Sequence, residues 1–488
     1  MTIANCKSWK LANKQLILLI LVALLVRLYR IDNPIADWHA FRQADTASVT
    51  REYVKHGVNL LEPKYHDLSN IQSGKDNLNG YRMVEFPFIN GLIATLIRTF
   101  PFLPLVITSR LFAVFASLGT LVFIYQFVEI ISKNKQAAFF SGLFFALLPF
   151  SIYYSRVVLP EPFFLFFSMG SLTWFASALT KKNFTTQPSF YLSAIFLSLA
   201  FLLKPFVVFL APVYVVLFFQ NQPWKKIFHW SWLVFIAIAL LPFWWWRDWI
   251  LQFPSGIPAS DWLFNSNQIR FRPAWFRWLF YERLTKLILG FTGLIFVAEG
   301  LLANQKKINY LLWSWGVGLF TYISAIATGN VQHDYYQVIF IPFIAISLGF
   351  GFYSLWEKAQ AEKNNLKLIK QIILIFLVTI MLVASWKNLS GYFNVNHWEY
   401  VEAGQTVDSL TPTDAKVIAP AFGDTIFLFQ TNRTGWPIGF EIDKKIELGA
   451  THYVTTSYDD EARELEDKYQ TLEKTDSYLL LDLRKTKQ

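Results

Sequence analysis

Long apolar runs separated by short polar linkers make up most of the chain. A helix needs about 20 apolar residues to cross about 30 Å of hydrocarbon, so runs near this length predict membrane spans. They occur at roughly 15–30, 104–131, 136–152, 159–180, 189–203, 205–220, 228–246, 285–303, 308–328, 335–356 and 368–386. The pattern predicts a polytopic α-helical membrane protein with about eleven transmembrane helices. The two runs that meet at Lys204-Pro205 also fit a single broken helix.

The polar linkers give these spans an orientation, because lysines gather in cytoplasmic loops. If the runs alternate, one side holds Lys133, Lys135, Lys181, Lys182, Lys225, Lys226, Lys306, Lys307, Lys358, Lys363, Lys367 and Lys370, together with the N-terminal lysines. The N-terminus is therefore expected in the cytoplasm. The apolar run 86–100 is short, and counting it as a span would move every later lysine pair to the other face. We expect a juxtamembrane helix there.

This topology predicts two large outer loops, at about residues 31–103 and about 247–284. After residue 387 the composition changes to that of a small α/β domain. Its expected strands are VIAPAF, TIFLFQ, THYVTTS and YLLLDL, and its expected helix is DDEARELEDKYQTLEK. We therefore expect a membrane domain over 1–386 and an extracytoplasmic α/β domain over 387–488. The chain has no phosphate-binding GxGxxG or GxxxxGK[ST] motif, so no nucleotide is assigned.

Composition supports the membrane class and narrows the partners. The chain is 54% hydrophobic and 16% charged, against about 25% charged residues in soluble domains. The net charge of +10 would suggest nucleic acid in a soluble protein. Here it lies mostly in the linkers between apolar runs, so we expect membrane lipids as partners and no nucleic acid. A single cysteine excludes an intramolecular disulfide.

The first candidate for chemistry follows the first span, in HAFRQADTASVTREYVKHG at residues 39–57. This stretch predicts an amphipathic helix that carries Arg42 and Asp45. Ionisable groups at the end of a membrane span mark a functional site by default. The alternative for Asp45 is a helix cap, since an Asp ahead of TASV can accept the first backbone N–H groups. Asp37 is the rival acid of the same loop.

The second and third candidates lie where later spans reach the same face. In YYSRVVLPEPFF, the prolines on either side of Glu161 are expected to hold the chain extended and place the carboxylate at the outer surface. A local ion pair with Arg156 is the alternative. Lys204 lies between two apolar runs with no acid nearby in the sequence. It would bind a lipid phosphate, or else snorkel to the headgroups.

The fourth candidate is GNVQHDYYQVIFIP, with His333, Asp334, Tyr335 and Tyr336 at the outer mouth of a span. A His–Asp pair could bind metal or carry a proton, whereas tyrosines at that depth also fit the interfacial aromatic belt.

The second large outer loop carries arginines and no lysine: Arg247, Arg270, Arg272, Arg277 and Arg283. The planar guanidinium binds phosphate bidentately. Cation–π packing on Trp262, Trp275 and Trp278 is the alternative.

Together these features resemble a known family. They are an acid in the helix of a long first outer loop, EFPF before an interfacial helix, an acid in the second outer loop and an H-x-Y-Y segment opening a late span. The arrangement resembles the GT-C glycosyltransferases, specifically the protein O-mannosyltransferase and aminoarabinose transferase group called glycosyltransferase family 39. The resemblance covers about residues 15–386.

The resemblance implies transfer of a sugar from a polyprenyl-phosphate carrier outside the cell membrane, with inversion. It maps the family's catalytic acid onto Asp45, which is followed by TASVTREYVKH, Gly57 and Pro63. Glu161 matches the second-loop acid. Two positions depart from the pattern: Thr46 stands where a second acid is common, and Glu85 stands where the family has Lys or His before its prolines. The acceptor can be a lipid, a glycan or a protein.

The residue types fit this chemistry. The acceptor hydroxyl must lose a proton as it attacks, which makes Asp45 the candidate base. The leaving phosphate needs fixed cations, and the available ones are Lys204, Arg247, Arg270 and Arg272. Arg42, Glu85, His333, Tyr335 and Tyr336 are further substrate-binding candidates. Glu161, Glu85 and His333 could complete a divalent metal site, or could orient Asp45 and the sugar hydroxyls. The catalytic candidates are therefore Asp45 and Glu161, and no other cofactor is indicated.

Two other functions remain as alternatives. A lipid-linked glycan flippase would line a transport path with these charges, although transporters place ionisable groups near the bilayer midplane and repeat their halves. A non-enzymatic sensor or assembly protein would use the outer domain to bind a partner.

Overall fold

The computed structural model describes residues 5–303, 305–363 and 365–487. The side chains of residues 5–13 lie outside the description, and with them most of the N-terminal lysines on which the orientation prediction rests. The chain forms two compact units. The helical unit contains Met1–Tyr29, Ala113–Trp246 and Ser260–Gly391, and the mixed unit contains Arg30–Phe112, Arg247–Ala259 and Tyr392–Gln488. The first outer loop thus shares a unit with the C-terminal segment, and separate domains over 1–386 and 387–488 stay a prediction.

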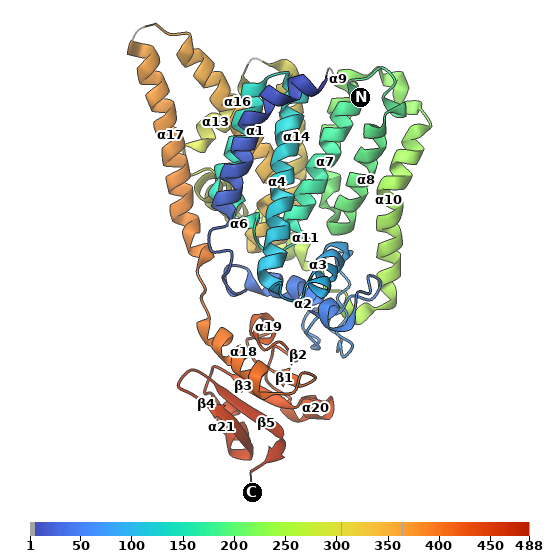
Figure 1. Ribbon diagram of the computed structural model, residues 1–488, viewed down its shortest axis with the longest axis vertical. Helices are drawn as coiled ribbons and strands as arrows, with labels where there is room; N and C mark the ends of the chain where they lie inside the picture. Colours follow the sequence, from blue (N-terminus) through green and yellow to red (C-terminus); the bar gives the residue numbers. More distant parts are fainter. Residues whose placement is uncertain (1–4, 304, 364, 488) are drawn as a thin grey trace. The chain divides into compact units, whose positions relative to one another are not determined.

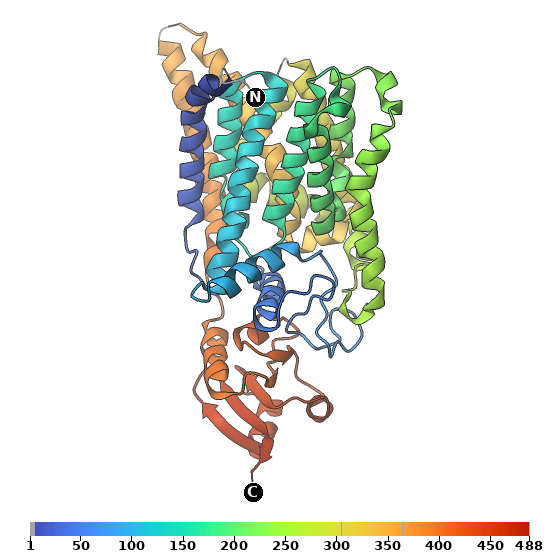
Figure 2. The same cartoon turned by 45° about the vertical axis from the view of Figure 1, so that its right-hand side comes forward.

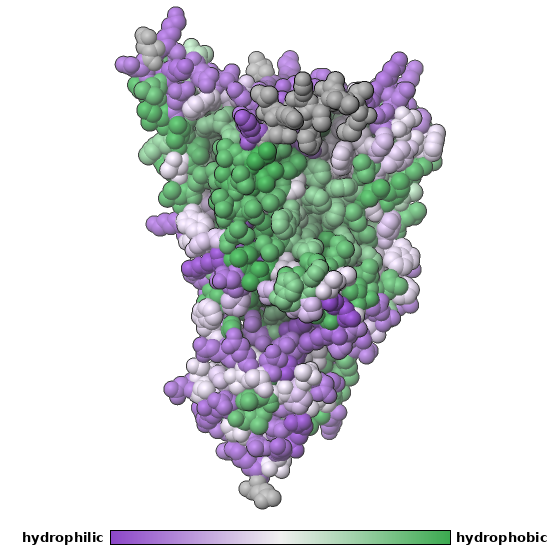
Figure 3. All heavy atoms as spheres, in the orientation of Figure 1, coloured by the Kyte–Doolittle hydropathy of each residue, from purple (hydrophilic) through white to green (hydrophobic). Residues whose placement is uncertain are grey.

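Long helices that run alongside one another form the helical unit (Figures 1 and 2). They are α1 (Asn5–Arg27), α4 (Leu105–Ser132), α5 (Lys135–Leu147), α7 (Glu161–Leu179), α8 (Pro188–Leu203), α9 (Ala211–Asn221), α10 (Ser231–Trp249), α13 (Gly293–Leu302), α14 (Lys306–Ala325), α16 (Ile341–Gln360) and α17 (Asn365–Leu389). The start of α4 and the end of α10 belong to the mixed unit. Figure 3 shows apolar residues gathered over these helices, as a lipid-facing surface requires.

Five helical segments of the described residues are long and apolar enough to cross a membrane: Leu105–Ser132, Glu161–Leu179, Ser231–Gln252, Asp334–Gln360 and Asn365–Leu410. A sixth results if Pro273–Ile288 and Gly293–Leu302, bent by 106°, count as one span. The predicted class, a polytopic helical membrane protein with a small α/β region, is confirmed.

Several expected spans are broken where the backbone demands it. The run 136–152 is divided into α5 and the short α6 (Pro149–Tyr154), because proline has no N–H to continue the helix. The run 285–303 bends where Gly290 and Phe291 adopt φ of 46° and 64°. At Lys204 the backbone is extended, with φ −150° and ψ 122°, because the following proline disfavours the helical region.

The mixed unit holds α2 (Ala40–His56), α3 (Phe88–Thr99), α18 (Trp398–Leu410), α19 (Ile426–Gln430), α20 (Ile442–Glu447), α21 (Asp460–Lys468) and one five-stranded sheet. Two element predictions for its C-terminal part were wrong. TIFLFQ forms helix α19 instead of a strand, and YQTLEK leaves the expected helix to form strand β4. Both are short runs in which helical and strand patterns are hard to tell apart.

The sheet has the strand order β2-β1-β3-β5-β4. The strands are β1 (Lys416–Ile418), β2 (Thr434–Trp436), β3 (His452–Thr455), β4 (Tyr469–Lys474) and β5 (Leu479–Thr486). β1 is parallel to β2 and β3, whereas β5 is antiparallel to β3 and β4.

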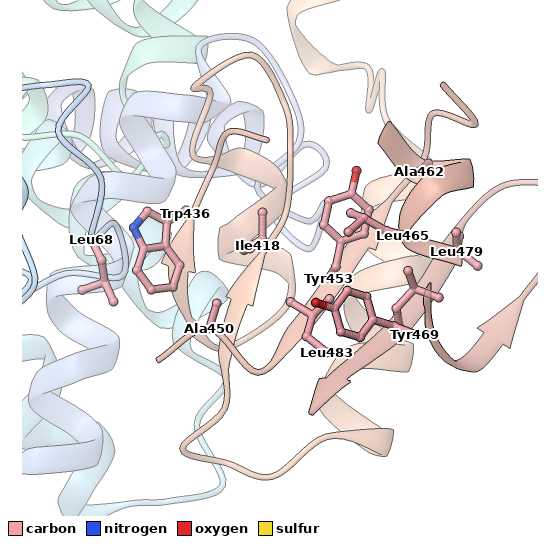
Figure 4. Close-up of a cluster of buried hydrophobic side chains, with 11 residues drawn as sticks. Leu68, Ile418, Trp436, Ala450, Tyr453, Ala462, Leu465, Tyr469, Leu479 and Leu483 are labelled. Atoms are coloured by element: carbon pink, nitrogen blue, oxygen red, sulfur yellow. The ribbon is translucent and has the colours of Figure 1, made fainter. Parts of the chain in front are cut away.

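The first outer loop continues this sheet beyond β2. The N–H of Gly435 donates to the carbonyl of His66 at 2.9 Å, and the N–H of Leu68 donates to the carbonyl of Gly435 at 2.8 Å. The Leu68 side chain lies beside Trp436 in the buried cluster over the sheet (Figure 4). Loop and C-terminal segment therefore share one core.

Glycines allow close contacts between helices of the helical unit. A Cβ atom on Gly351 of α16 would lie 1.8 Å from the carbonyl oxygen of Phe296 on α13, and one on Gly300 of α13 would lie 2.1 Å from that of Ser347. Small residues let helix backbones approach in this way within membranes.

We expect Gly351→Ala to lower the unfolding temperature in detergent, because the added methyl group must push backbone apart at a cost of about 1–3 kcal/mol. Gly316→Ala on α14 is the matched control, since its Cβ would lie 3.8 Å from the nearest atom of Phe343, an ordinary contact. Thermal unfolding followed by tryptophan fluorescence compares the two. Equal unfolding temperatures would contradict the close-packing argument.

Candidate functional site

Asp45 lies within helix α2, in its second turn. The helix begins at Ala40 after His39, whose side chain makes no capping bond, so the capping alternative for Asp45 was wrong. The helix ends at His56, and the next residue, Gly57, has a φ of 98° that suits glycine. Asp45 is 2% exposed. A carboxylate this deeply buried needs compensating donors.

Three side chains supply them. The Arg82 guanidinium lies 3.0 Å from Asp45 Oδ2, and the Gln72 amide donates to the same oxygen at 3.0 Å. The Thr425 hydroxyl donates to Asp45 Oδ1 at 2.7 Å. Arg82 also donates to the Gln72 side-chain oxygen, which links the two donors. The base candidate is thus held by two loop residues and one residue of the C-terminal segment.

Arg42, one turn before Asp45 in α2, forms an ion pair with Glu85 of the loop after α2. This pair lies beside the Asp45 carboxylate. With Asp45, Arg82 and Asn90 they line a small pocket of about 20 Å³, which is room for about one water molecule. The rival acid Asp37 is fully buried and bound by Arg110 and Gln43. Its contacts therefore hold the loop together.

A buried group of titratable side chains, Tyr65, His66 and Asp67, lies close to Asp45. Burial raises the pKa of the Asp67 carboxyl to about 6, partly opposed by hydrogen bonds from Ser69 and Tyr65, and Asp45 adds to the rise. Burial also lowers the pKa of His66 to about 3, so this imidazole is neutral at physiological pH. Its Nε2 lies 3.1 Å from the carbonyl oxygen of Thr425.

A second cluster lies in the helical unit. Glu161 Oε1 and Lys204 Nζ form an ion pair at 2.6 Å, and Glu161 is 3% exposed. The ammonium also lies 5.6 Å and 5.5 Å from the ring centres of Tyr335 and Tyr336. Three candidate stretches thus converge here, and Lys204 has the acidic partner that its sequence neighbourhood lacks.

The local geometry around Glu161 differs from the prediction. Pro160 has helical angles, φ −70° and ψ −17°, and Glu161 is the first residue of α7. The chain before this span is therefore not extended, because a proline at the start of a helix fits it. The carboxylate is buried instead of lying at the surface.

His333 stacks on Tyr335, with ring centres 5.3 Å apart, and meets Trp262 edge-on at 5.7 Å. Its neighbour Asp334 is fully buried, accepts a hydrogen bond from Tyr154 and lies 3.4 Å from Arg283. The His333 ring thus packs among aromatic rings, and Asp334 has an arginine partner.

The arginines of the second outer loop differ in their contacts and in their exposure. Arg283 lies over the Trp278 ring at 5.6 Å, as the cation–π alternative expects, and Arg270 lies 6.0 Å from the Phe271 ring centre. Arg247 and Arg272 are exposed. Phosphate binding by Arg247, Arg270 and Arg272 stays a prediction.

Among the described residues, the candidate metal ligands do not gather into one cluster. Within residues 5–303, 305–363 and 365–487, no group of three or more His, Cys, Asp or Glu side chains is arranged to hold an ion. In the structure Glu85 is paired with Arg42 and Glu161 with Lys204.

Sequence reasoning missed Arg82, Gln72 and Thr425, the direct partners of Asp45. Arg82 had a usable signal, since it stands in YRMVEFP with Glu85 and a cation so near an acid of the outer loop is a candidate partner. Thr425 had none, because 380 residues separate it from Asp45.

The chain is similar to known proteins in sequence and in fold. Residues 17–259 match the family described as dolichyl-phosphate-mannose-protein mannosyltransferase. No curated protein matches the chain significantly. Among solved structures, ArnT from Cupriavidus metallidurans bound to undecaprenyl phosphate is 12% identical, with a TM-score of 0.63 over 95% of this chain and 97% of ArnT.

Two further structures share the fold. The oligosaccharyltransferase AglB from Archaeoglobus fulgidus, in complex with an inhibitory peptide and a dolichol-phosphate, is 10% identical, with a TM-score of 0.58 over 92% of this chain and 70% of AglB. The arabinofuranosyltransferase AftD from Mycobacteria is 14% identical, with a TM-score of 0.55 over 90% of this chain and 36% of AftD. All three are GT-C glycosyltransferases, and none supports the flippase alternative.

The buried Asp67 gives a pH prediction. Its folded pKa of about 6 exceeds the ordinary value of 3.8, so the fold favours the protonated acid. The contribution of protonated Asp67 to the free energy of unfolding is fully present below the ordinary pKa. It is lost as pH rises through 6, and the total loss is up to about 3 kcal/mol. Asp67→Asn keeps the acceptor for the Ser69 N–H and cannot ionise. We expect the unfolding temperature of Asp67→Asn to rise relative to that of wild type as pH increases from 5 to 7.5.

Thermal unfolding at half-unit pH steps measures this difference. Asp76→Asn, in an exposed part of the same loop, is the control variant. A difference between Asp67→Asn and wild type that stays constant across the range would show that Asp67 is not held protonated by the fold.

Proposed function

The chain is a membrane glycosyltransferase of the GT-C type, and from this premise we propose that it takes a sugar from a polyprenyl-phosphate carrier. The acceptor is a hydroxyl of a lipid, glycan or protein on the extracytoplasmic face of the cell membrane. Undecaprenyl phosphate in the ArnT structure and dolichol-phosphate in the AglB structure support this donor class. The family's description, which includes dolichyl-phosphate-mannose, supports it independently.

Asp45 is the proposed general base. The acceptor oxygen attacks the anomeric carbon as its proton passes to the Asp45 carboxylate. The bond from that carbon to the phosphate oxygen breaks, and the phosphate leaves with the electron pair. One displacement of this kind inverts the anomeric centre. Asp45 is proposed over Asp37 because it lines the pocket and Asp37 is enclosed by Arg110 and Gln43.

The observation that carries this proposal is the arrangement of donors around Asp45. An ionised carboxylate has about four lone-pair sites. Arg82 and Gln72 take those of Oδ2, and Thr425 takes one of Oδ1. Oδ1 therefore keeps capacity for one more donor, which is what an acceptor hydroxyl would supply. A base held in one orientation loses little entropy when it reacts.

The remaining site residues are proposed to bind substrate. Cations lower the cost of the charge that develops on the leaving phosphate, and the proposed ones are Arg42, Lys204, Arg247, Arg270 and Arg272. Glu161 is proposed to orient Lys204 through their 2.6 Å ion pair. Glu85, His333, Tyr335 and Tyr336 are proposed to contact the sugar or the acceptor by hydrogen bonds and ring stacking.

Asp45→Asn tests the proposal most directly. The amide keeps the shape of the side chain and loses the proton acceptor, so turnover should fall about 10²–10⁴-fold while donor binding persists. The full-length protein in detergent is offered polyprenyl-phosphate mannose and polyprenyl-phosphate aminoarabinose, and release of polyprenyl phosphate is measured with envelope lipids and peptides as acceptors.

Asp37→Asn is the comparison variant, with unfolding temperature measured for both. It removes the other buried acid of the same loop, so it should lose stability and keep catalytic turnover in the folded fraction. Full turnover by Asp45→Asn, or loss of turnover by a folded Asp37→Asn alone, would overturn the assignment.

A further inference from the structure

A residue of the C-terminal segment touches the proposed base. Thr425 precedes helix α19 and is 2% exposed, and its hydroxyl donates to Asp45 Oδ1 at 2.7 Å. The same hydroxyl lies 3.3 Å from the carbonyl oxygen of Phe41, a longer alternative acceptor. A hydroxyl has one proton, and the shorter contact goes to the charged acceptor, which gives the stronger bond.

The position of Thr425 makes this contact informative. A threonine before a helix ordinarily uses its oxygen to accept a backbone N–H of the first turn. Thr425 makes no such capping bond. The carboxylate of Asp424 takes the N–H of Ile426 instead, at 2.8 Å. The Thr425 hydroxyl is therefore available to donate to the neighbouring chain segment, and the N–H of Ile426 in α19 still has an acceptor.

The backbone of Thr425 is fixed from the loop side. His66, fully buried in the first outer loop, has Nε2 3.1 Å from the Thr425 carbonyl oxygen, where a neutral ring donates. Farther along α19, Arg51 of α2 donates to the carbonyl of Phe429 at 2.7 Å, and its guanidinium lies 4.4 Å from the centre of that ring. The His66 contact holds the start of α19 against the loop after α2, and the Arg51 contacts hold its end against α2, the helix that carries Asp45.

We propose that Thr425 is a positioning residue for Asp45, so that the C-terminal segment is an integral part of the catalytic centre. The inference rests on the proposed role of Asp45 as base. Thr425 fixes the rotation of the carboxylate so that the free capacity of Oδ1 faces the pocket. A C-terminal segment that served only to recognise acceptors would have no need of a buried contact to the base.

Removal of this donor should have a chemical as well as a structural effect. A hydrogen bond to the ionised carboxylate favours the ionised form, so its loss makes Asp45 harder to deprotonate. The charged and titratable groups that interact with Asp45 from the surrounding segments are Arg82, Tyr65, His66, Asp67 and Asp424, with Arg42 and Glu85 in the same pocket. None of these is altered when Thr425 is changed.

The test uses the full-length protein and polyprenyl-phosphate mannose and aminoarabinose as donors. Thr425→Val keeps the shape and removes the donor. We expect kcat to fall at least about 10-fold with the KM for donor unchanged, and the acid limb of the kcat/KM profile to move up by about one pH unit. Thr425→Ser restores the hydroxyl and should restore both the rate and the limb.

Gln430→Met is the matched control, because Gln430 of the same helix donates to the carbonyl of Ile35 at 2.7 Å and does not touch Asp45. It should leave the acid limb in place even if the unfolding temperature falls. An acid limb that Thr425→Val leaves unmoved, or that Gln430→Met moves equally, would overturn the positioning role. If Asp45→Asn keeps full turnover, the proposed base itself fails, which is a separate outcome.

Discussion

A buried negative charge sets the conditions that the mixed unit must meet. Asp45 is almost completely withdrawn from water, and a carboxylate in that state is tolerated only when donors surround it. Its donors come from the loop after α2 and from the segment before α19. These stretches must therefore fold together, and the extension of the sheet by the loop and the shared core around Trp436 provide the apolar burial that keeps them together.

The helical unit also holds buried charges, and there an acidic and a basic side chain compensate each other. Glu161 and Lys204 are each costly near hydrocarbon, and their ion pair reduces that cost. The tyrosine rings beside Lys204 add favourable cation–π contacts to the ammonium. Proline placement makes the pair possible: Pro205 ends α8 at Lys204, and Pro160 and Pro162 flank the start of α7 at Glu161. The charged side chains thus stand at helix ends, where the backbone already departs from the regular pattern.

The sequence predicted those features that depend on periodicity and charge. The apolar runs predicted the membrane class, and Asp45, Glu161 and Lys204 became site candidates because a charge beside apolar residues is conspicuous. Short elements were predicted less well, since TIFLFQ and YQTLEK fit more than one conformation and tertiary packing decides between them. The partners of the charged residues depend on contacts between distant segments. Arg82 left a trace in the sequence, whereas a threonine 380 residues from Asp45 could be found only in three dimensions.

The contact between Asp45 and Thr425 also links the finished site to protein synthesis. Ribosomes add about 5–20 residues per second, so the 380 residues between the two take about 20–75 s to make. During that interval the loop exists without its last donor and without the strand it extends. A nascent or prematurely ended chain would leave an acid without full compensation and an apolar face uncovered, which are the features that quality-control proteases and chaperones recognise. The donor set of Asp45 can therefore be completed only after residue 425 has been made.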